Sequence, residues 1–224
     1  MKLARLSLAA AATLFLLISG CAAPGSPEEK AAAIQSPMHQ LIIGNDRYAS
    51  GHPMYPHQNA ERRSELAKGQ HPVAIVVSCS DSRVPPEIVF DQGLGDLFVV
   101  RTAGNVVDDQ ALGSIEYAVE HLHTKLIVVL GHENCGAVKA TIDGGAAPGH
   151  IGSITHAIEP AVAKARQEKG DLMDNAVNEN VLLVVNQIKT SGPILSHEVE
   201  AGKLLVVGAR YDLTPGTVHW LTKP

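Results

Sequence analysis

The chain has 224 residues, and its 23 acidic side chains outnumber 18 lysines and arginines, for a formal net charge of −5. Without a basic excess or a lysine–arginine cluster, a nucleic-acid partner is not expected. The length suits one domain with a full hydrophobic core.

The opening segment, residues 1–20, has the pattern of a signal peptide. Lys2 and Arg5 give it a positive start, residues 6–17 are apolar, and small residues lead to Cys21. This apolar run suits a secretory signal and is too short for an ordinary spanning helix. The segment resembles a bacterial lipoprotein signal, which implies cleavage before Cys21 and lipid attachment to its sulfur. We expect an exported, periplasmic protein anchored to a membrane through that lipid only; a plain signal peptide with an incidental cysteine is the alternative.

Residues 21–37 are small, polar and interrupted by proline, which predicts a flexible tether. Ala22 replaces the aspartate that holds some lipoproteins at the inner membrane, so the outer membrane is favoured. Further on, Ser36 can cap a helix that has a proline in its first turn and Gly51 just beyond its end. Residues 38–224 are expected to form a single domain.

Short aliphatic runs alternate with helical patterns along the rest of the chain. The runs are rich in β-branched residues, show no alternation and end at Gly, Pro or charge, as in strands that are buried on both faces. The expected strands cover residues 73–78, 97–101, 125–131 and 203–209, and the expected helices 60–69, 108–123, 153–170 and 173–192. This order predicts an α/β fold with a mostly parallel central sheet flanked by helices, whose chemistry lies at the carboxyl ends of the strands.

Three potential metal ligands follow two of these strands. Cys79 comes after the first strand, and His132 and Cys135 come after the third. If the two strands are neighbours, the three side chains meet at one edge of the sheet. Two thiolates and an imidazole suit Zn²⁺ with a fourth position left open, as in catalytic zinc sites. A disulfide between Cys79 and Cys135, or two inert buried thiols, are the alternatives.

An acid and a base follow the first cysteine. Asp81 can become the fourth metal ligand, or it can accept a hydrogen bond from a metal-bound water. Arg83 can bind the Asp81 carboxylate through two hydrogen bonds and so keep it off the zinc, which is the arrangement we expect. Zinc lowers the pKa of bound water to about 7, so hydroxide would be available at neutral pH. A solvated surface ion pair is the alternative.

Three motifs resemble those of β-class carbonic anhydrases: CSDSRVPPE, GDLFVVRTAGN and GHENCGAV, which begin at residues 79, 95 and 131. The similarity extends from about residue 41 to residue 221. It implies zinc-catalysed, reversible hydration of carbon dioxide to bicarbonate and a proton, by zinc-bound hydroxide that an Asp–Arg dyad orients. It also implies homodimers or homotetramers with active sites at the subunit interface.

The resemblance assigns roles residue by residue. The zinc ligands fall on Cys79, His132 and Cys135, and the dyad falls on Asp81 and Arg83. Residues that bind substrate or line its pocket fall on Gln70, Phe98, Ala103, Tyr117 and Gly136. For Gln70 an ordinary loop position is the alternative, and for the two aromatic residues core packing.

Two other functions remain open at this point. A hydrolase of carbonyl sulfide or carbon disulfide would use the same scaffold. A lipoprotein that binds a metal or an anion without turnover would use the same ligands, although it would not need a carboxylate that orients hydroxide.

Overall fold

The computed structural model describes residues 27–222, with side chains from residue 36 onward. The expected signal peptide and the lipid site at Cys21 lie outside this range. The described chain forms one sheet in the order β2-β1-β3-β4-β5, with the strands β1 (Ala74–Cys79), β2 (Leu97–Thr102), β3 (Leu126–His132), β4 (Leu205–Tyr211) and β5 (Val218–Trp220). β1 to β4 are parallel to their neighbours, and β5 is antiparallel to β4.

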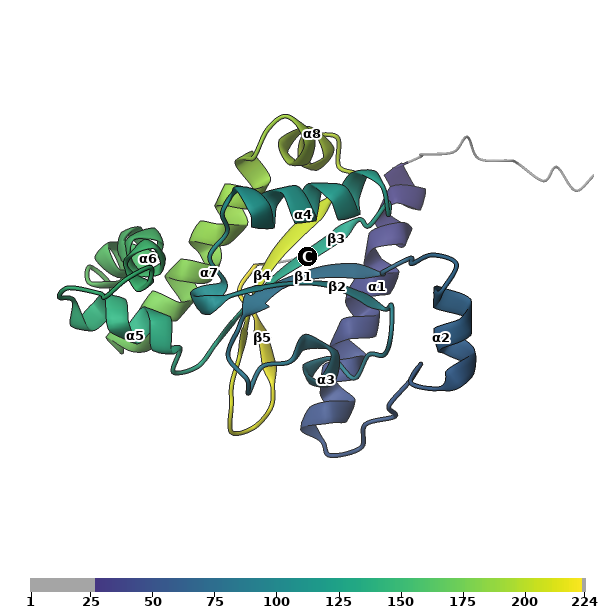
Figure 1. Ribbon diagram of the computed structural model, residues 1–224, viewed down its shortest axis with the longest axis horizontal. Coiled ribbons are helices and arrows are strands. Elements are labelled where there is room, and N and C mark those ends of the chain that lie inside the picture. Colours follow the sequence, from purple (N-terminus) through teal and green to yellow (C-terminus); the bar gives the residue numbers. More distant parts are fainter. Residues whose placement is uncertain (1–26, 223–224) are drawn as a thin grey trace, which may run out of the picture.

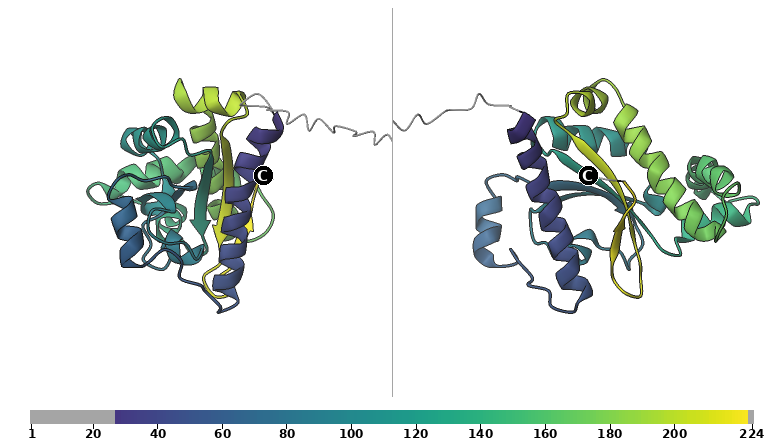
Figure 2. Two further views of the ribbon diagram at one scale, coloured as in Figure 1. Left: turned by 90° about the vertical axis from the view of Figure 1, so that its right-hand side faces the viewer. Right: turned by 180° about the vertical axis from the view of Figure 1, so that it is seen from behind.

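Helices cover both faces of the sheet, as predicted (Figures 1 and 2). α1 and α3 lie on one face, α4, α7 and α8 lie on the other, and α5 and α6 pack beside α7. The helices are α1 (Pro27–Ala49), α2 (Ala60–Leu66), α3 (Pro86–Val89), α4 (Asp109–Glu120), α5 (Gly136–Asp143), α6 (Ile151–Ala165), α7 (Leu172–Thr190) and α8 (Ile194–Glu200). None of the helices in residues 27–222 is both long and apolar enough to cross a membrane.

The four predicted strands are confirmed, and their uninterrupted apolar character has a simple cause. Every residue of β1 and β3 is buried. Alternate side chains point to opposite faces: Val76 packs on the α1 side of the sheet and Ile75 on the α4 and α7 side. A strand with helices on both faces needs an apolar residue at every position. β5, α3, α5 and α8 were not predicted; each of these elements has eight residues or fewer.

The expected start of the first helix was wrong. α1 begins at Pro27 rather than at Ser36, and Pro37 lies inside it. The sequence PEEKAAAIQ before Ser36 consists mostly of strong helix formers, which offset the hydrogen bond that an internal proline removes. Residues 27–37 of the expected tether are therefore helical. Further along α1, Met38 and Leu41 are buried against the sheet of the same chain.

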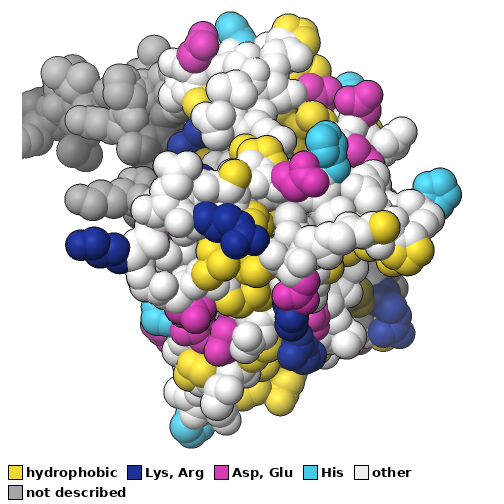
Figure 3. Space-filling model, turned by 90° about the vertical axis from the view of Figure 1, so that its left-hand side faces the viewer, with side chains coloured by type: hydrophobic (Ala, Val, Ile, Leu, Met, Phe, Trp, Pro, Cys, Tyr) yellow, Lys and Arg dark blue, Asp and Glu magenta, His cyan; other side chains and the backbone are white. Residues whose placement is uncertain are grey.

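Charges of both signs are dispersed over the molecular surface that Figure 3 shows. Lys and Arg side chains are scattered over this face rather than gathered in one patch, and hydrophobic side chains reach the surface between the charged groups.

Candidate active site

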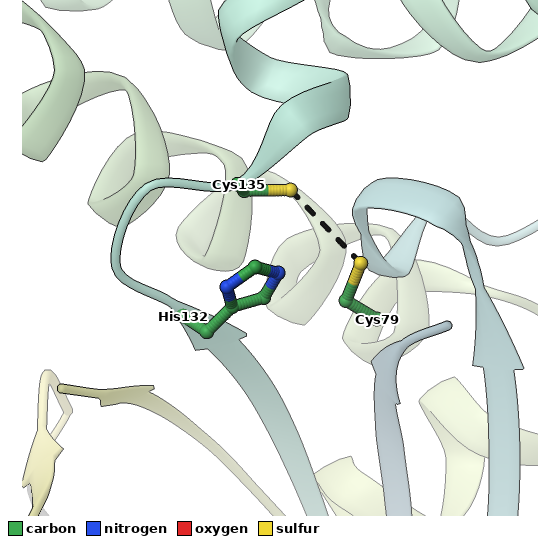
Figure 4. Close-up of side chains that lie close together, drawn as sticks. All are labelled: Cys79, His132 and Cys135. Atoms are coloured by element: carbon green, nitrogen blue, oxygen red, sulfur yellow. Dashed lines mark hydrogen bonds between the residues drawn. The ribbon is translucent and has the colours of Figure 1, made fainter. Parts of the chain in front are cut away.

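The three predicted metal ligands converge at the carboxyl edge of the sheet. Cys79 ends β1, His132 ends β3, and the two strands are hydrogen-bonded neighbours. Cys135 lies three residues beyond His132, immediately before α5. The side chains point toward one another (Figure 4), and their ligand atoms all lie within 4.8 Å.

The distance between the two sulfurs distinguishes a disulfide from a metal site. The Sγ atoms of Cys79 and Cys135 are 4.0 Å apart and both thiols are free, whereas a disulfide bond is about 2.05 Å long. Two sulfurs on a tetrahedral zinc ion, each about 2.3 Å from the metal, lie about 3.8 Å apart. The pair is therefore spaced for a shared metal ion, and the disulfide alternative is wrong for this structure.

His132 is held in the orientation that a metal ligand needs. Its ring is fully buried, and Nδ1–H donates a hydrogen bond of 2.8 Å to the backbone oxygen of Glu133. This bond places the lone pair on Nε2, which has no hydrogen-bond partner among the described residues. A buried imidazole nitrogen with a free lone pair beside two sulfurs suits a metal ligand.

The two thiols compete for one negative charge. The hydrogen bond from Cys135 lowers the pKa of Cys79 to about 4 although burial opposes this, and the backbone N–H groups of Asp81 and Gly104 lower it further. The same hydrogen bond, together with burial, raises the pKa of Cys135. The protein by itself thus favours a single thiolate. A cation between the sulfurs would stabilise both thiolates, and the donor set fits Zn²⁺.

The predicted dyad is present at the open side of this cluster. The Nε and Nη2 atoms of Arg83 donate to the two carboxylate oxygens of Asp81 at 2.9 and 2.8 Å, and the backbone N–H of Arg83 donates to Oδ1 at 2.9 Å. These bonds hold the pKa of Asp81 well below its usual range, against the opposing effect of partial burial. Asp81 Oδ2 is 3.8 Å from His132 Nε2. An ionised carboxylate therefore faces the cluster without bonding to it.

Sequence reasoning missed a second arginine at this site. Arg101, in β2, donates from Nε to the backbone oxygen of Cys79 at 2.9 Å and from Nη2 to that of Asp81 at 2.6 Å. It thereby holds the segment that carries one ligand and the dyad acid. The sequence did contain a clue to this role. Arg101 lies at the end of a predicted strand, and that strand pairs with the strand that ends in Cys79.

Two of the five predicted pocket residues lie at the edge where the ligands meet. Ala103 begins a short 3₁₀ turn (Ala103–Asn105) directly after Thr102, which pairs with Cys79. Gly136 is the first residue of α5 and follows Cys135.

The other three lie elsewhere in the chain. Phe98 pairs with Ile75, four residues before Cys79, which is about 13 Å along the sheet at 3.3 Å per residue. Gln70 is exposed and precedes the start of β1. Tyr117 is 49% exposed near the carboxyl end of α4. These side chains do not line the metal cluster of their own chain.

Fold and site together define a class: an α/β protein with a mostly parallel sheet and a buried Cys–His–Cys group that could hold a metal ion. The family model described as carbonic anhydrase matches residues 74–218. The chain belongs to the β-class carbonic anhydrase family.

Several relatives are similar over most of their length. The chain is 45% identical over 183 residues to a carbonic anhydrase of Mycolicibacterium smegmatis, with 80% of this chain and 89% of the relative covered. It is 42% identical over 180 residues to carbonic anhydrase 2 of Mycobacterium tuberculosis, with 79% and 87% covered.

Solved structures share the fold. The β-carbonic anhydrase CcaA has a TM-score of 0.66 and 28% identity, with 83% of this chain and 95% of that chain covered. One of two tetrameric β-carbonic anhydrases of Sordaria macrospora has a TM-score of 0.66 and 27% identity, with 84% and 98% covered.

Proposed function

We propose that this protein is a zinc enzyme that interconverts carbon dioxide and water with bicarbonate and a proton. The observation that carries the proposal is the buried Cys79–His132–Cys135 cluster whose open side faces the Asp81–Arg83 pair. Zinc bound by these ligands would supply Lewis acidity, which lowers the pKa of a coordinated water to about 7. Relatives named carbonic anhydrase, at 42–45% identity, support the same activity.

The dyad residues would have distinct roles. Asp81 is ionised and can accept a hydrogen bond from the reacting water, which orients the water's lone pair toward carbon dioxide. Arg83 keeps the carboxylate ionised and turned toward itself through its two hydrogen bonds. Because both Asp81 oxygens are engaged by Arg83, the carboxylate does not occupy the position next to His132 Nε2.

We propose that a second copy of the chain completes the substrate pocket. Gln70, Phe98 and Tyr117 match pocket positions of the family but lie away from the cluster of their own chain. β2 is an edge strand, so Phe98 lies on the border of the sheet, where another chain can approach. The tetrameric assembly of the Sordaria macrospora relatives supports association of copies.

We also propose that the mature protein is exported and held at a membrane by lipid on Cys21. The support is the sequence alone: a positive start, an apolar run and small residues before Cys21.

A pair of cysteine variants tests the zinc mechanism and the lipid anchor. We expect about one zinc ion per chain in the wild type, and Cys135→Ser should lose the metal and the hydration of carbon dioxide measured by stopped flow. Cys21→Ser is the matched control: it should keep zinc and activity but leave the membrane fraction. Full activity in metal-free Cys135→Ser would reject the mechanism, and membrane-bound Cys21→Ser would reject the lipid anchor. Rates on carbonyl sulfide in the same preparations would reveal the alternative hydrolase.

A further inference from the structure

A polar side chain lies in the apolar face of α7. Asn180 is 1% exposed and is flanked along the helix by the buried residues Val177 and Val181. Its Nδ2 atom donates a hydrogen bond of 2.8 Å to the backbone oxygen of Gly104. A buried amide among valines is costly unless it is hydrogen-bonded, so this contact accounts for part of its presence.

Gly104 links Asn180 to the metal cluster. While its oxygen accepts from Asn180, its backbone N–H donates to the sulfur of Cys79 at 3.2 Å. The residue has a φ of +68°, and a Cβ atom there would lie 2.7 Å from the Cδ1 atom of Ile158. Only glycine fits this left-handed position without strain. The N–H group is therefore directed at the sulfur by a turn that Asn180 holds from the other side.

Close packing of α7 on the sheet holds Asn180 in place. A Cβ atom at Gly208, in β4, would lie 2.8 Å from the Cγ1 atom of Val181 and 3.3 Å from the Cγ2 atom of Val185. The missing side chain thus lets the helix lie close to the sheet. Val181 follows Asn180 directly in the sequence, so this close contact also limits movement of the Asn180 backbone.

We propose that Asn180 is a positioning residue that acts on the Cys79 sulfur through Gly104. By holding Gly104, it keeps an N–H dipole on the sulfur, which stabilises the thiolate and withdraws electron density from it. The strength of metal binding and the donation from sulfur to metal then both depend on a residue that touches neither the metal nor the substrate. This inference rests on the metal site of the proposed function.

The test replaces Asn180 and reads the metal site directly. Asn180→Leu keeps the branching and the number of side-chain heavy atoms but has no hydrogen-bond donor, and Asn186→Leu is the matched control at an exposed position of the same helix. In Asn180→Leu, the zinc dissociation constant measured by chelator competition should rise about tenfold. In the cobalt-substituted protein, the thiolate-to-metal charge-transfer band should move to longer wavelength, because sulfur lone pairs without the N–H bond lie higher in energy. Asn186→Leu should change neither quantity.

A purely structural role predicts a different result. If Asn180→Leu lowers only the unfolding temperature, and both the cobalt spectrum and the zinc affinity match the wild type, the proposal is overturned. Asn180→Asp, which keeps the size of the side chain and also lacks the donor, serves if the leucine variant does not fold. Zinc content and hydration rate of the wild type test the proposed function separately, since the cobalt spectrum is informative even in a protein that does not hydrate carbon dioxide.

Discussion

Two arginines stabilise the segment that follows Cys79, and they bind different parts of it. Arg101 donates to the backbone oxygens of Cys79 and Asp81 and thereby fixes the course of the main chain. Arg83 binds the carboxylate of Asp81 and determines where that side chain points. The separation matters because a substitution of Arg83 leaves the hydrogen bonds of Arg101 to the ligand segment in place.

Arg83→Gln tests the role of the dyad at the scale of a single residue. Without the guanidinium, the Asp81 carboxylate is free to turn toward His132 Nε2, which is already only 3.8 Å from Oδ2. We expect the rate of carbon dioxide hydration at neutral pH to fall about 100-fold while the zinc content stays at the wild-type level. Lys139→Gln, which removes an exposed cation paired with Asp143, is the control. An unchanged rate in Arg83→Gln would show that Arg83 and Asp81 form only a surface ion pair.

At the scale of elements, Asp91 joins three segments on the α1 side of the sheet. Its carboxylate is 2% exposed and accepts from Arg47, in the last turn of α1, at 2.5 Å. It also accepts from the backbone N–H groups of Met54 and Tyr55, in the loop after α1. Asp91 itself follows α3. One carboxylate thus holds the end of α1, and the loop that follows α1, against the short helix α3.

The ionisation of Asp91 predicts a pH dependence of stability. Burial opposes its charge, but the N–H of Met54, the Arg47 side chain and the N–H of Tyr55 outweigh that effect and lower the pKa of Asp91. A carboxyl group whose pKa is lower in the folded state stabilises the protein above its unfolded pKa of about 3.9, and this contribution is lost as the pH falls through the folded value.

Asp91→Asn should therefore lower the free energy of unfolding at neutral pH by about 1 to 3 kcal/mol. It should also reduce the loss of stability that the wild type shows below about pH 4. Urea unfolding at neutral and acidic pH measures both effects, with the exposed Asp46→Asn on α1 as the control. If the two variants show the same pH dependence as the wild type, Asp91 does not supply the ionised anchor.

At the scale of the whole molecule, the parallel sheet separates the expected parts of the pocket. Some lie at the amino ends of the strands and the others at the carboxyl ends. Strand β1 begins near Gln70 and ends at Cys79, and Phe98 lies near the start of β2. Parallel strands all begin at the same end of the sheet. Residues before the strands and residues after them are therefore separated by the length of a strand. A pocket that uses both kinds of residue needs two chains that meet.

Mixed dimers distinguish a shared pocket from one formed within a chain. One chain carries Cys135→Ser, and the other carries Gln70→Ala with Tyr117→Ala, both at exposed positions. With different tags on the chains, the purified mixed dimer should have about half the activity of the wild-type dimer, because one of its two sites is then intact.

The control places all three substitutions in one chain and pairs that chain with a wild-type partner. A shared pocket predicts that this dimer is nearly inactive, since the only metal site faces an altered partner. If this dimer is half active and the first one is inactive, each pocket is formed within a single chain.

The sequence by itself predicted the parallel sheet and the candidate ligands and dyad, although it left a disulfide between Cys79 and Cys135 open. Cys79, His132 and Cys135 adjoin strongly apolar runs, and the carboxyl ends of neighbouring parallel strands must share an edge. Asp81 and Arg83 are two residues apart, so their pairing is local.

Only the tertiary structure decided which distant residues reach the cluster. Asn180 and Gly104 are 76 positions apart, and their hydrogen bond depends on how closely α7 packs on the sheet. The separation of Phe98 from the cluster follows from the register of β1 with β2. Helix packing and strand register result from contacts between many side chains at once. They therefore cannot be predicted from any short stretch of the sequence.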